Sequence, residues 1–174
     1  MKKIVIYLAC GRAKLKHENV VYNDLFEDRD LKCDMMSVNL EDFDVLIATP
    51  PCNYYSRANS YKSKETSIYA QTTKHLLPDI IDKFIKTGKP FIVENVRSAP
   101  LFSKNGLFEK NCFIYFHGRH TYWTNVMINF SKIPQTYDFK SIPGYGCIRL
   151  KKYVQGGDNV NLVLDYFLDV VFSR

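Results

Sequence analysis

The sequence predicts an α/β fold: one compact domain over residues 1–174, built on an open, mostly parallel sheet with flanking helices. Two observations carry this prediction. Short apolar runs rich in β-branched residues alternate along the chain with polar segments of helical periodicity. The apolar runs are continuous, which is typical of strands buried on both faces of a parallel sheet. A chain of 174 residues can bury one proper core and is short for two domains.

Four apolar segments are predicted as strands, and they are Ile4–Ala9, Val20–Tyr22, Asp44–Thr49 and Pro90–Asn95. Between the last two, residues 64–90 carry apolar side chains at helical spacing, and Gly88 and Pro90 end the run. Pro78 is expected to divide or kink this helical segment, because it has no backbone N–H. The order strand, helix, strand predicts a βαβ unit and hence a parallel sheet.

Farther along the chain, "NCFIYFHG" and "YGCIRL" predict two more strands. The segment "DNVNLVLDYFLDVVF" predicts a closing amphipathic helix, with an apolar side made of Val160, Val163, Leu164, Phe167, Leu168 and Val171. Residues 125–152 hold the least regular pattern, and their prolines and glycines predict loops.

Composition excludes several classes of protein. Hydrophobic residues make up 46% and charged residues 24%, which argues against disorder, and no apolar run is long enough to span a membrane. The five cysteines have no paired CxxC spacing and the four histidines have no metal-ligand spacing, so no metal site is expected. The apolar start runs into Gly11 and Arg12, which favours a buried first strand over a secretion signal. The odd number of cysteines without such a signal favours reduced thiols in a cytoplasm. The net charge of +6 is compatible with a polyanionic partner such as DNA.

Polar residues stand where the predicted strands end. Cys52 follows the strand "DVLIAT" after two prolines, Glu94 ends "FIVEN", and Gly11 follows the first strand. Ligands of open α/β sheets bind at the carboxyl ends of the strands, so a thiol and a carboxylate could face one pocket there. The alternative is structural: a loop cysteine and a helix-capping acid. Spacing alone leaves both interpretations open.

Two motifs resemble those of the DNA cytosine-5 methyltransferase family. "DVLIATPPCNYYS" is similar to its Pro-Cys motif, and "KPFIVENV" is similar to its Glu-Asn-Val motif, in the same order along the chain. The resemblance implies a Rossmann-like fold of the S-adenosylmethionine-dependent methyltransferase type. It also implies that Cys52 is the nucleophile, that Glu94 shares a proton with the base, and that the substrate contacts include Ser56, Asn95, Tyr55 and Arg57.

Weaker matches extend the resemblance from about residue 20 to the C-terminus. "HGRHTY" is similar to the Gln-x-Arg-x-Arg motif, with Arg119 at the first arginine as a catalytic candidate and Thr121 at the second, which the family uses near the cytosine carbonyl. "YVQGGDNVN" resembles the final signature at Gly157 and Val160. The resemblance implies that S-adenosylmethionine is the cofactor and that the residues binding it are Gly11, Asp24, Asp34, Pro51 and Asn159.

The chain departs from the family in two regions. The connection after the first strand offers one glycine, Gly11, and too few residues for the family's full helix. Residues 125–152 are also too short for a separate target-recognition domain. A partner protein that completes the cofactor pocket or the recognition region is therefore an open alternative.

Three functions follow as hypotheses. The first is transfer of a methyl group from S-adenosylmethionine to cytosine in DNA, in a bacterial or phage-infected cytoplasm and in the context of phage or restriction–modification systems. The second is a catalytically degenerate protein of the same fold that binds DNA or a host protein, as an inhibitor or decoy. The third is modification of free cytosine nucleotides. Side chains that could contact a nucleic acid are Tyr54, Tyr55, Arg57, Lys62, Lys64 and Lys74, although the lysines equally suit a solvated helix face.

Overall fold

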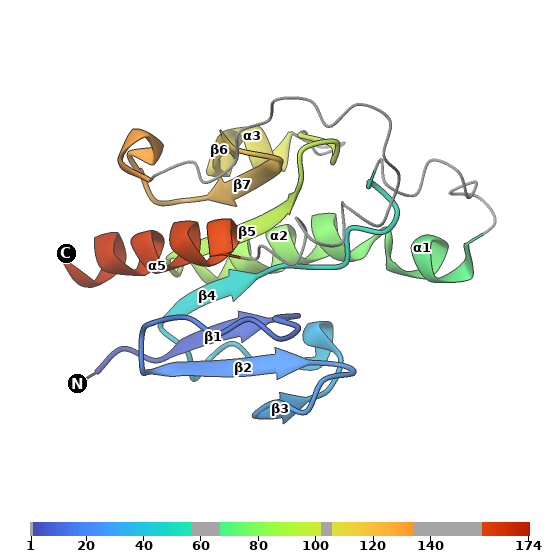
Figure 1. Ribbon diagram of the computed structural model, residues 1–174, viewed down its shortest axis with the longest axis horizontal. Coiled ribbons are helices and arrows are strands. Elements are labelled where there is room, and N and C mark those ends of the chain that lie inside the picture. Colours follow the sequence, from blue (N-terminus) through green and yellow to red (C-terminus); the bar gives the residue numbers. More distant parts are fainter. Residues whose placement is uncertain (1, 57–66, 102–105, 134–157) are drawn as a thin grey trace.

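A computed structural model of the chain describes residues 2–56, 67–101, 106–133 and 158–174. In these residues the strands form one mixed sheet in the order β3-β2-β1-β4-β5-β7-β6 (Figure 1). The strands are β1 Val5–Leu8, β2 Val20–Asp24, β3 Leu31–Lys32, β4 Val45–Ala48, β5 Phe91–Val96, β6 Phe113–His117 and β7 His120–Thr124. Neighbours from β3 to β5 pair in parallel, whereas β7 is antiparallel to both β5 and β6. The predicted α/β fold with an open, mostly parallel sheet is confirmed.

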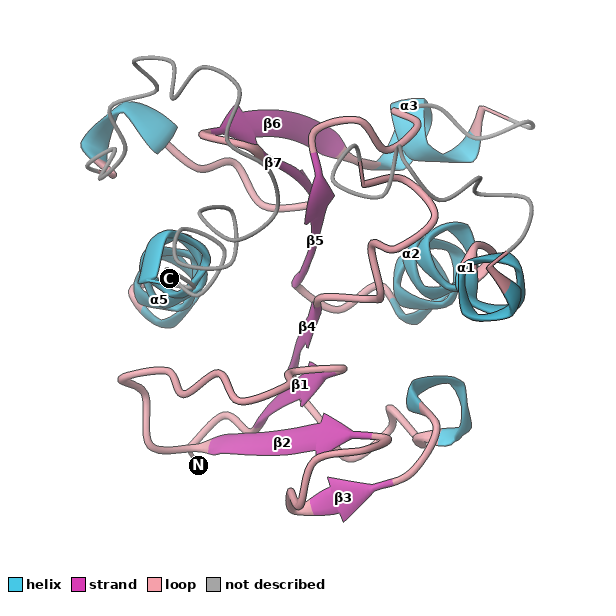
Figure 2. Ribbon diagram, turned by 45° about the vertical axis from the view of Figure 1, so that its right-hand side comes forward, coloured by secondary structure: helices cyan, strands magenta, loops and turns pink. Residues whose placement is uncertain are grey.

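Helices cover both faces of this sheet (Figure 2). They are η1 Met35–Ser37, α1 Ile68–Thr73, α2 Leu76–Thr87, α3 Leu107–Asn111, η3 Phe130–Lys132 and α5 Asp158–Phe172. On one face, α2 packs Leu77, Ile80 and Phe84 against the sheet together with η1 and α3. On the other face, α5 packs its buried apolar side against β1, β4 and β5, through Val163, Leu164, Phe167, Leu168 and Val171. We call these the α2 face and the α5 face of the sheet.

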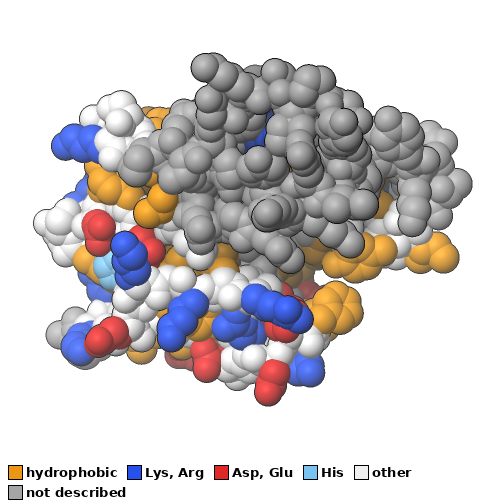
Figure 3. Space-filling model, in the orientation of Figure 1, with side chains coloured by type: hydrophobic (Ala, Val, Ile, Leu, Met, Phe, Trp, Pro, Cys, Tyr) orange, Lys and Arg blue, Asp and Glu red, His pale blue; other side chains and the backbone are white. Residues whose placement is uncertain are grey.

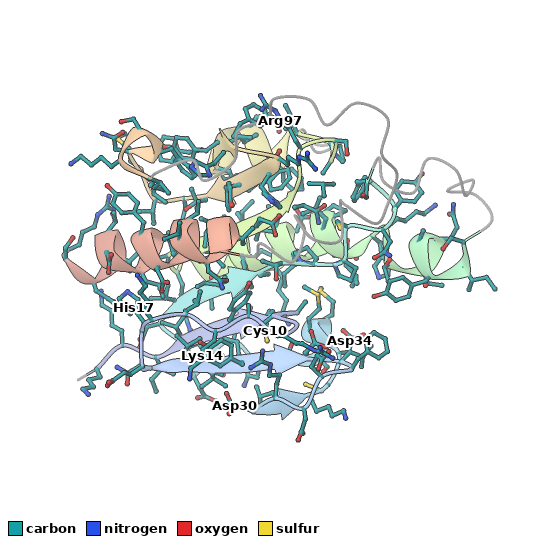
Figure 4. All side chains as sticks on the ribbon, in the orientation of Figure 1. Cys10, Lys14, His17, Asp30, Asp34 and Arg97 are labelled. Carbon is teal, nitrogen blue, oxygen red and sulfur yellow. The ribbon has the colours of Figure 1, made fainter. Side chains whose placement is uncertain are left out.

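The connection between β1 and β2 forms no helix, as its length predicts. Instead it docks on α5, whose residues lie far away in the sequence. The backbone N–H of Lys16 donates to Oδ1 of Asp165 at 2.9 Å, and Nε2 of His17 lies 2.9 Å from Oδ1 of Asp169 (Figure 4). The ring of His17 also makes an edge contact with Phe172. The C-terminal helix therefore covers the part of the sheet that a helix after β1 would otherwise cover.

The predicted break at Pro78 is misplaced. The helical segment does divide, but at Lys74 and His75, between α1 and α2. Pro78 is the third residue of α2, in the first turn, where the backbone N–H groups have no partner within the helix. A proline there loses no hydrogen bond, so it is compatible with the start of a helix. Gly88 ends α2 with a left-handed φ of 68°, as its position predicted.

The remaining predicted elements lie in the C-terminal part of the chain. The closing helix and the strand in "NCFIYFHG" are confirmed as α5 and β6. The strand expected in "YGCIRL" and most of the loop region 125–152 lie outside the described residues.

Charges of both signs are mixed on the described surface in the view of Figure 3. The excess of basic over acidic residues in the whole chain lies mainly in residues 57–66, 102–105 and 134–157, by sequence. Among the residues that the structure describes, no helix combines the length and apolar character needed to cross a bilayer.

Candidate functional site

The chain order of the strands reverses between β1 and β4, which is where ligands bind in sheets of this kind. Because β1, β2, β4 and β5 are parallel, their carboxyl ends lie on one edge of the sheet. The register aligns Leu8 with Ala48 and Ala48 with Val93. The residues that follow these positions therefore gather at one edge, and they include Gly11, Cys52 and Glu94.

Cys52 lies in a tight turn just beyond β4. Its carbonyl accepts hydrogen bonds from the backbone N–H groups of Tyr55 at 3.0 Å and Ser56 at 2.8 Å. The turn is tied to β5 by Asn95, whose buried Nδ2 donates to the carbonyl of Pro50 at 3.0 Å. Ser98, which follows β5, donates its hydroxyl to the carbonyl of Tyr55. Groups from the end of β5 thus hold the Pro-Pro-Cys loop in place.

Glu94 points to the α5 face, because strand residues alternate and its neighbour on that face, Ile92, packs in the α5 core. The Glu94 residue is 9% exposed. Its Oε1 lies 2.6 Å from Nδ1 of His120, a short contact typical of a charge-assisted hydrogen bond. Neither Glu94 nor His120 belongs to a helix cap, so the alternative of a capping acid is wrong for Glu94.

The Glu94 carboxylate affects the pKa of the Cys52 thiol. Burial raises the pKa of Cys52, and the negative charge of Glu94 raises it further. Burial also raises the pKa of Tyr122, with the charge of Glu94 as a second cause. Burial raises the pKa of Tyr7 as well; the hydrogen bond with Thr49 opposes this rise and the charge of Glu94 adds to it. The Glu94 carboxylate is therefore near enough to the Cys52 thiol and to both tyrosine hydroxyls to raise their pKa values.

The turn after β1 is held in an unusual backbone conformation. Ala9 has a φ of +50° and Gly11 a φ of +55°, the left-handed region that few residues other than glycine adopt. Ala9 keeps this conformation because its carbonyl accepts from the Thr49 hydroxyl at 2.8 Å and its N–H donates to the buried side chain of Asn23 at 3.3 Å. Strained backbone of this kind clusters at functional sites, where the surroundings hold it.

Asp24 ends β2 and closes the same corner. Its Oδ2 accepts from the N–H of Gly11 at 2.8 Å, and its Oδ1 accepts from the N–H groups of Phe26 and Glu27 at 2.9 and 3.0 Å. Burial raises the pKa of Asp24, but these three hydrogen bonds and the nearby Arg29 outweigh burial and hold it below its ordinary value. Asp24 is therefore ionised at neutral pH.

This corner has features that a polar ligand would need. A Cβ built at Gly11 meets no heavy atom within 4 Å, so space is open there. A carboxylate oxygen can accept two hydrogen bonds, and Oδ2 of Asp24 accepts one from the described residues. The rings of Phe26 and Tyr69 lie 6.5 Å apart nearby, and both are partly exposed. The ends of β1 and β2 thus leave open space at Gly11 beside a carboxylate oxygen of Asp24 that can accept a second hydrogen bond.

The other predicted site residues are spread more widely. Asp34 caps η1, accepting from the N–H of Met36 at 2.7 Å, and its place near the carboxyl end of the sheet is shown in Figure 4. Pro51 lies in the loop with Cys52. Arg119 is exposed in the two-residue turn between β6 and β7. Arg57 lies outside the described residues, and Asn159 lies in the first turn of α5.

Thr121 cannot take part beside Glu94. It pairs with Asn95 in the register of β5 and β7, whereas Glu94 pairs with Tyr122. Successive residues of a strand point to opposite faces, so Thr121 points to the α2 face while His120 and Tyr122 share the α5 face with Glu94. His120, which the motif does not include, is therefore the residue of this segment that lies on the side of Glu94.

Sequence reasoning missed His120, although one signal could have found it. Gly118 and Arg119 separate "FIYFH" from "HTYWT", and a two-residue link with glycine between such runs predicts a β-hairpin. The alternation along the second strand would then have placed His120 with Tyr122. The contact with Glu94 depends on the pairing of β5 with β7, which the sequence does not reveal.

No group of three His, Cys, Asp or Glu side chains that could hold a metal ion occurs within the described ranges. Comparison with known proteins adds no relative: no family model matches the chain, and no curated protein matches it significantly.

Proposed function

We propose that this chain is a cytosine-5 methyltransferase-like enzyme that acts on cytosine in DNA through Cys52 and Glu94. The observation that carries the proposal is the placement of a thiol just beyond β4 and a carboxylate in the neighbouring parallel strand β5, where the charge of Glu94 raises the pKa of Cys52. The strand order β3-β2-β1-β4-β5, followed by a reversed β7, supports the methyltransferase type of α/β fold that the two motifs suggested.

In the proposed reaction, the Sγ of Cys52 forms a bond to C6 of the cytosine ring while the Glu94 carboxyl gives a proton to N3. The addition makes C5 nucleophilic, so that C5 can accept a methyl group. A water molecule then takes the C5 hydrogen as a proton, the bond from Sγ to C6 breaks with its electron pair returning to sulfur as the thiolate, and the proton on N3 returns to Glu94. Atoms and charges balance, and both side chains end in their starting forms.

The charge of Glu94 links its own protonation to the formation of the Cys52 thiolate. The negative charge of Glu94 disfavours the thiolate form of Cys52, because like charges repel. A proton on Glu94, or on a group beside it, removes that repulsion. Protonation near Glu94 therefore eases formation of the Cys52 thiolate at the step that needs it.

S-adenosylmethionine, when bound, would supply the methyl group from its positively charged sulfonium. Gly11 and Asp24 are the residues that would hold its nucleoside part, because one leaves open space and the other offers a free acceptor. The restraint of Ala9 by Thr49 and Asn23 would keep this corner preorganised.

A DNA substrate fits the basic excess in residues 57–66 and 134–157, which follow Cys52 and precede α5 in the sequence. The target base has to leave the duplex or be single-stranded, because C6 of a stacked base is out of reach. Arg97, next to the end of β5, is exposed and stacks on Phe116 with its guanidinium carbon 4.9 Å from the ring centroid. An arginine on an aromatic ring beside the site suits a phosphate or base.

The test is incubation of the chain with labelled S-adenosylmethionine and either single-stranded or duplex DNA, followed by detection of 5-methylcytosine. Cys52→Ser should abolish the product, while the control Cys112→Ser, on the α2 face, should keep it. Methylation that survives in Cys52→Ser would contradict the proposed role of the thiol.

A second candidate is a binding protein that keeps the fold without methyl transfer. The missing helix after β1 and the engagement of Asp24 by three backbone donors favour it. Calorimetry with S-adenosylmethionine and S-adenosylhomocysteine separates the two, because micromolar binding of either ligand contradicts a simple degenerate protein. The short region 125–152 also keeps free cytosine nucleotides as substrates, and product analysis with dCMP and dCTP tests them.

A further inference from the structure

The contact between Glu94 and His120 is the shortest side-chain hydrogen bond that involves the proposed catalytic residues. Nδ1 of His120 lies 2.6 Å from Oε1 of Glu94, and the two side chains are 27% and 11% exposed. Oε2 of Glu94 has no hydrogen-bond partner within the described part of the chain, and neither does the buried hydroxyl of Tyr122. His120 is thus the one described side chain that binds the Glu94 carboxylate, and it leaves the second oxygen available to a substrate.

Strand pairing fixes this contact. His120 pairs with Val96 and Tyr122 pairs with Glu94, so His120 sits diagonally across from Glu94 on the same face. The hairpin turn at Gly118, with a φ of 58°, sets this register, and the N–H of Arg97 donates to the carbonyl of Arg119 at 2.8 Å to close it. The backbone pairing of β5 with β7 therefore fixes the position of His120 relative to Glu94.

We propose that His120 is a positioning residue of this site, which shares one proton with Glu94 and supplies the proton that Glu94 passes to the pyrimidine. This inference rests on the proposed function for its role in methyl transfer. A histidine can give its proton up near neutral pH, whereas an arginine keeps its proton permanently.

The proton path is short and balanced. The Nδ1–H of protonated His120 donates to Oε1 of Glu94. This proton first moves to Glu94, which leaves a neutral imidazole and a carboxylic acid, and the Glu94 carboxyl then gives a proton to N3 of the base and becomes a carboxylate again. When Sγ of Cys52 leaves C6, the proton on N3 returns by the same route. The pair gains and loses no proton over the cycle.

In the part of the chain that the structure describes, few other titratable groups face this pair. Those that the charge of Glu94 reaches are Cys52, Tyr7 and Tyr122. The three are neutral while protonated, so none can replace His120 as a cation. From α5, which packs on this face, the buried acid is Asp165, and the N–H of Lys16 binds it.

The first experiment needs no turnover. ¹⁵N NMR of imidazole-labelled protein at pH 7 is expected to show His120 with protons on both ring nitrogens and a strongly deshielded Nδ1 proton. In Glu94→Gln the ring should revert to a neutral tautomer. A neutral His120 with the same spectrum in both proteins would overturn the shared proton.

The second experiment is the pH dependence of methyl transfer to a cytosine-containing oligonucleotide. The rate of the wild-type chain should fall at alkaline pH, where the pair has lost its proton. His120→Gln, which can still hydrogen-bond to Glu94, should be slower by about 10- to 100-fold and should lose this alkaline fall. His120→Arg should stay as slow as His120→Gln, because an arginine holds the charge but cannot give up its proton, and a restored rate would overturn the proposal. His75→Gln, at an exposed histidine on another element, is the matched control.

The outcomes separate the two proposals. If no cytosine substrate is methylated while the NMR spectra show the shared proton, the proposed function is refuted and the proton shared by His120 and Glu94 is supported. If methylation occurs and the pH profile of His120→Gln superimposes on that of the wild type, the proposed function stands and the role of His120 is refuted.

Discussion

Asn95→Ala tests how the Pro-Pro-Cys loop is held. Nδ2 of Asn95 donates to the buried carbonyl of Pro50 at 3.0 Å, and its Oδ1 accepts from the N–H of Val96 at 2.9 Å. Loss of a hydrogen bond costs about 1 kcal/mol, and a buried carbonyl left without a partner costs about 1–3 kcal/mol more. The free energy of unfolding should therefore fall by about 2–4 kcal/mol, and Tm by about 5–15 °C for a chain of this size.

The same substitution should free the loop that carries Cys52. A loss of about 1.4 kcal/mol in the free energy that keeps the loop closed corresponds to a tenfold change in its open population. The rate of Cys52 alkylation by iodoacetamide under native conditions should then rise about tenfold, measured on the Cys52 peptide by mass spectrometry. Urea unfolding followed by circular dichroism gives the stability in parallel.

Asn125→Ala is the matched control. Asn125 also makes two hydrogen bonds to backbone, with the N–H of Phe91 and the carbonyl of Lys89, but it is exposed and lies at the other end of β5. Asn125→Ala should lower the free energy of unfolding but leave the rate of Cys52 alkylation unchanged. The proteins are compared at urea concentrations that lie equally far below their own unfolding midpoints. The reasoning is refuted if Asn95→Ala changes stability by less than about 0.5 kcal/mol and leaves the alkylation rate as in the wild type.

Three further outcomes follow from the site. Burial and the charge of Glu94 raise the pKa of Cys52, so alkylation of Cys52 should increase only at a higher pH than alkylation of free cysteine. Glu94→Gln should shift this pH profile to lower pH, and an unshifted profile would count against an effect of Glu94 on the thiol. Gly11→Ala meets no clash but must adopt a φ of +55°, so urea unfolding should show a loss of about 1–2 kcal/mol, and a neutral result would mean that the turn relaxes. Arg97→Ala should weaken single-stranded DNA binding in anisotropy titrations and lower the salt slope by about 1, whereas Lys3→Ala, before β1, should do neither; equal slopes for both would exclude Arg97 as a phosphate contact.

The parallel part of the sheet could be predicted because its strands are short, continuous apolar runs. Ile4–Ala9 and Asp44–Thr49 each contain an observed strand, and they are buried on both faces as their composition indicates. The break before α2 was misplaced because Pro78 was expected to act as an interior residue. Proline is compatible with the first turn of a helix, and the sequence alone did not tell the first turn from the interior.

The candidate site was only partly predictable for a different reason. Cys52 follows β4 and Glu94 lies in β5, the two strands of one βαβ unit, so local order was enough to bring them to one edge. His120 reaches Glu94 through an antiparallel strand inserted between β5 and β6, and no local signal specifies that insertion. The hydrogen bonds of Asp24 were not predictable either: it accepts one from the loop after β1 and two from the loop after β2.

The docking of α5 on the loop between β1 and β2 has a consequence for how the chain is made. Lys16 and Asp165 are 149 positions apart, and His17 and Asp169 are 152 apart. A ribosome that adds about 5–20 residues per second needs roughly 8–30 s to pass from one partner to the other. Throughout that interval the α5 face of β1 and β4 has no helix to cover it, so the nascent chain exposes an apolar surface to solvent. We expect newly synthesised chains to need a chaperone until α5 emerges, and a ribosome stalled before Asp158 to yield an aggregation-prone product.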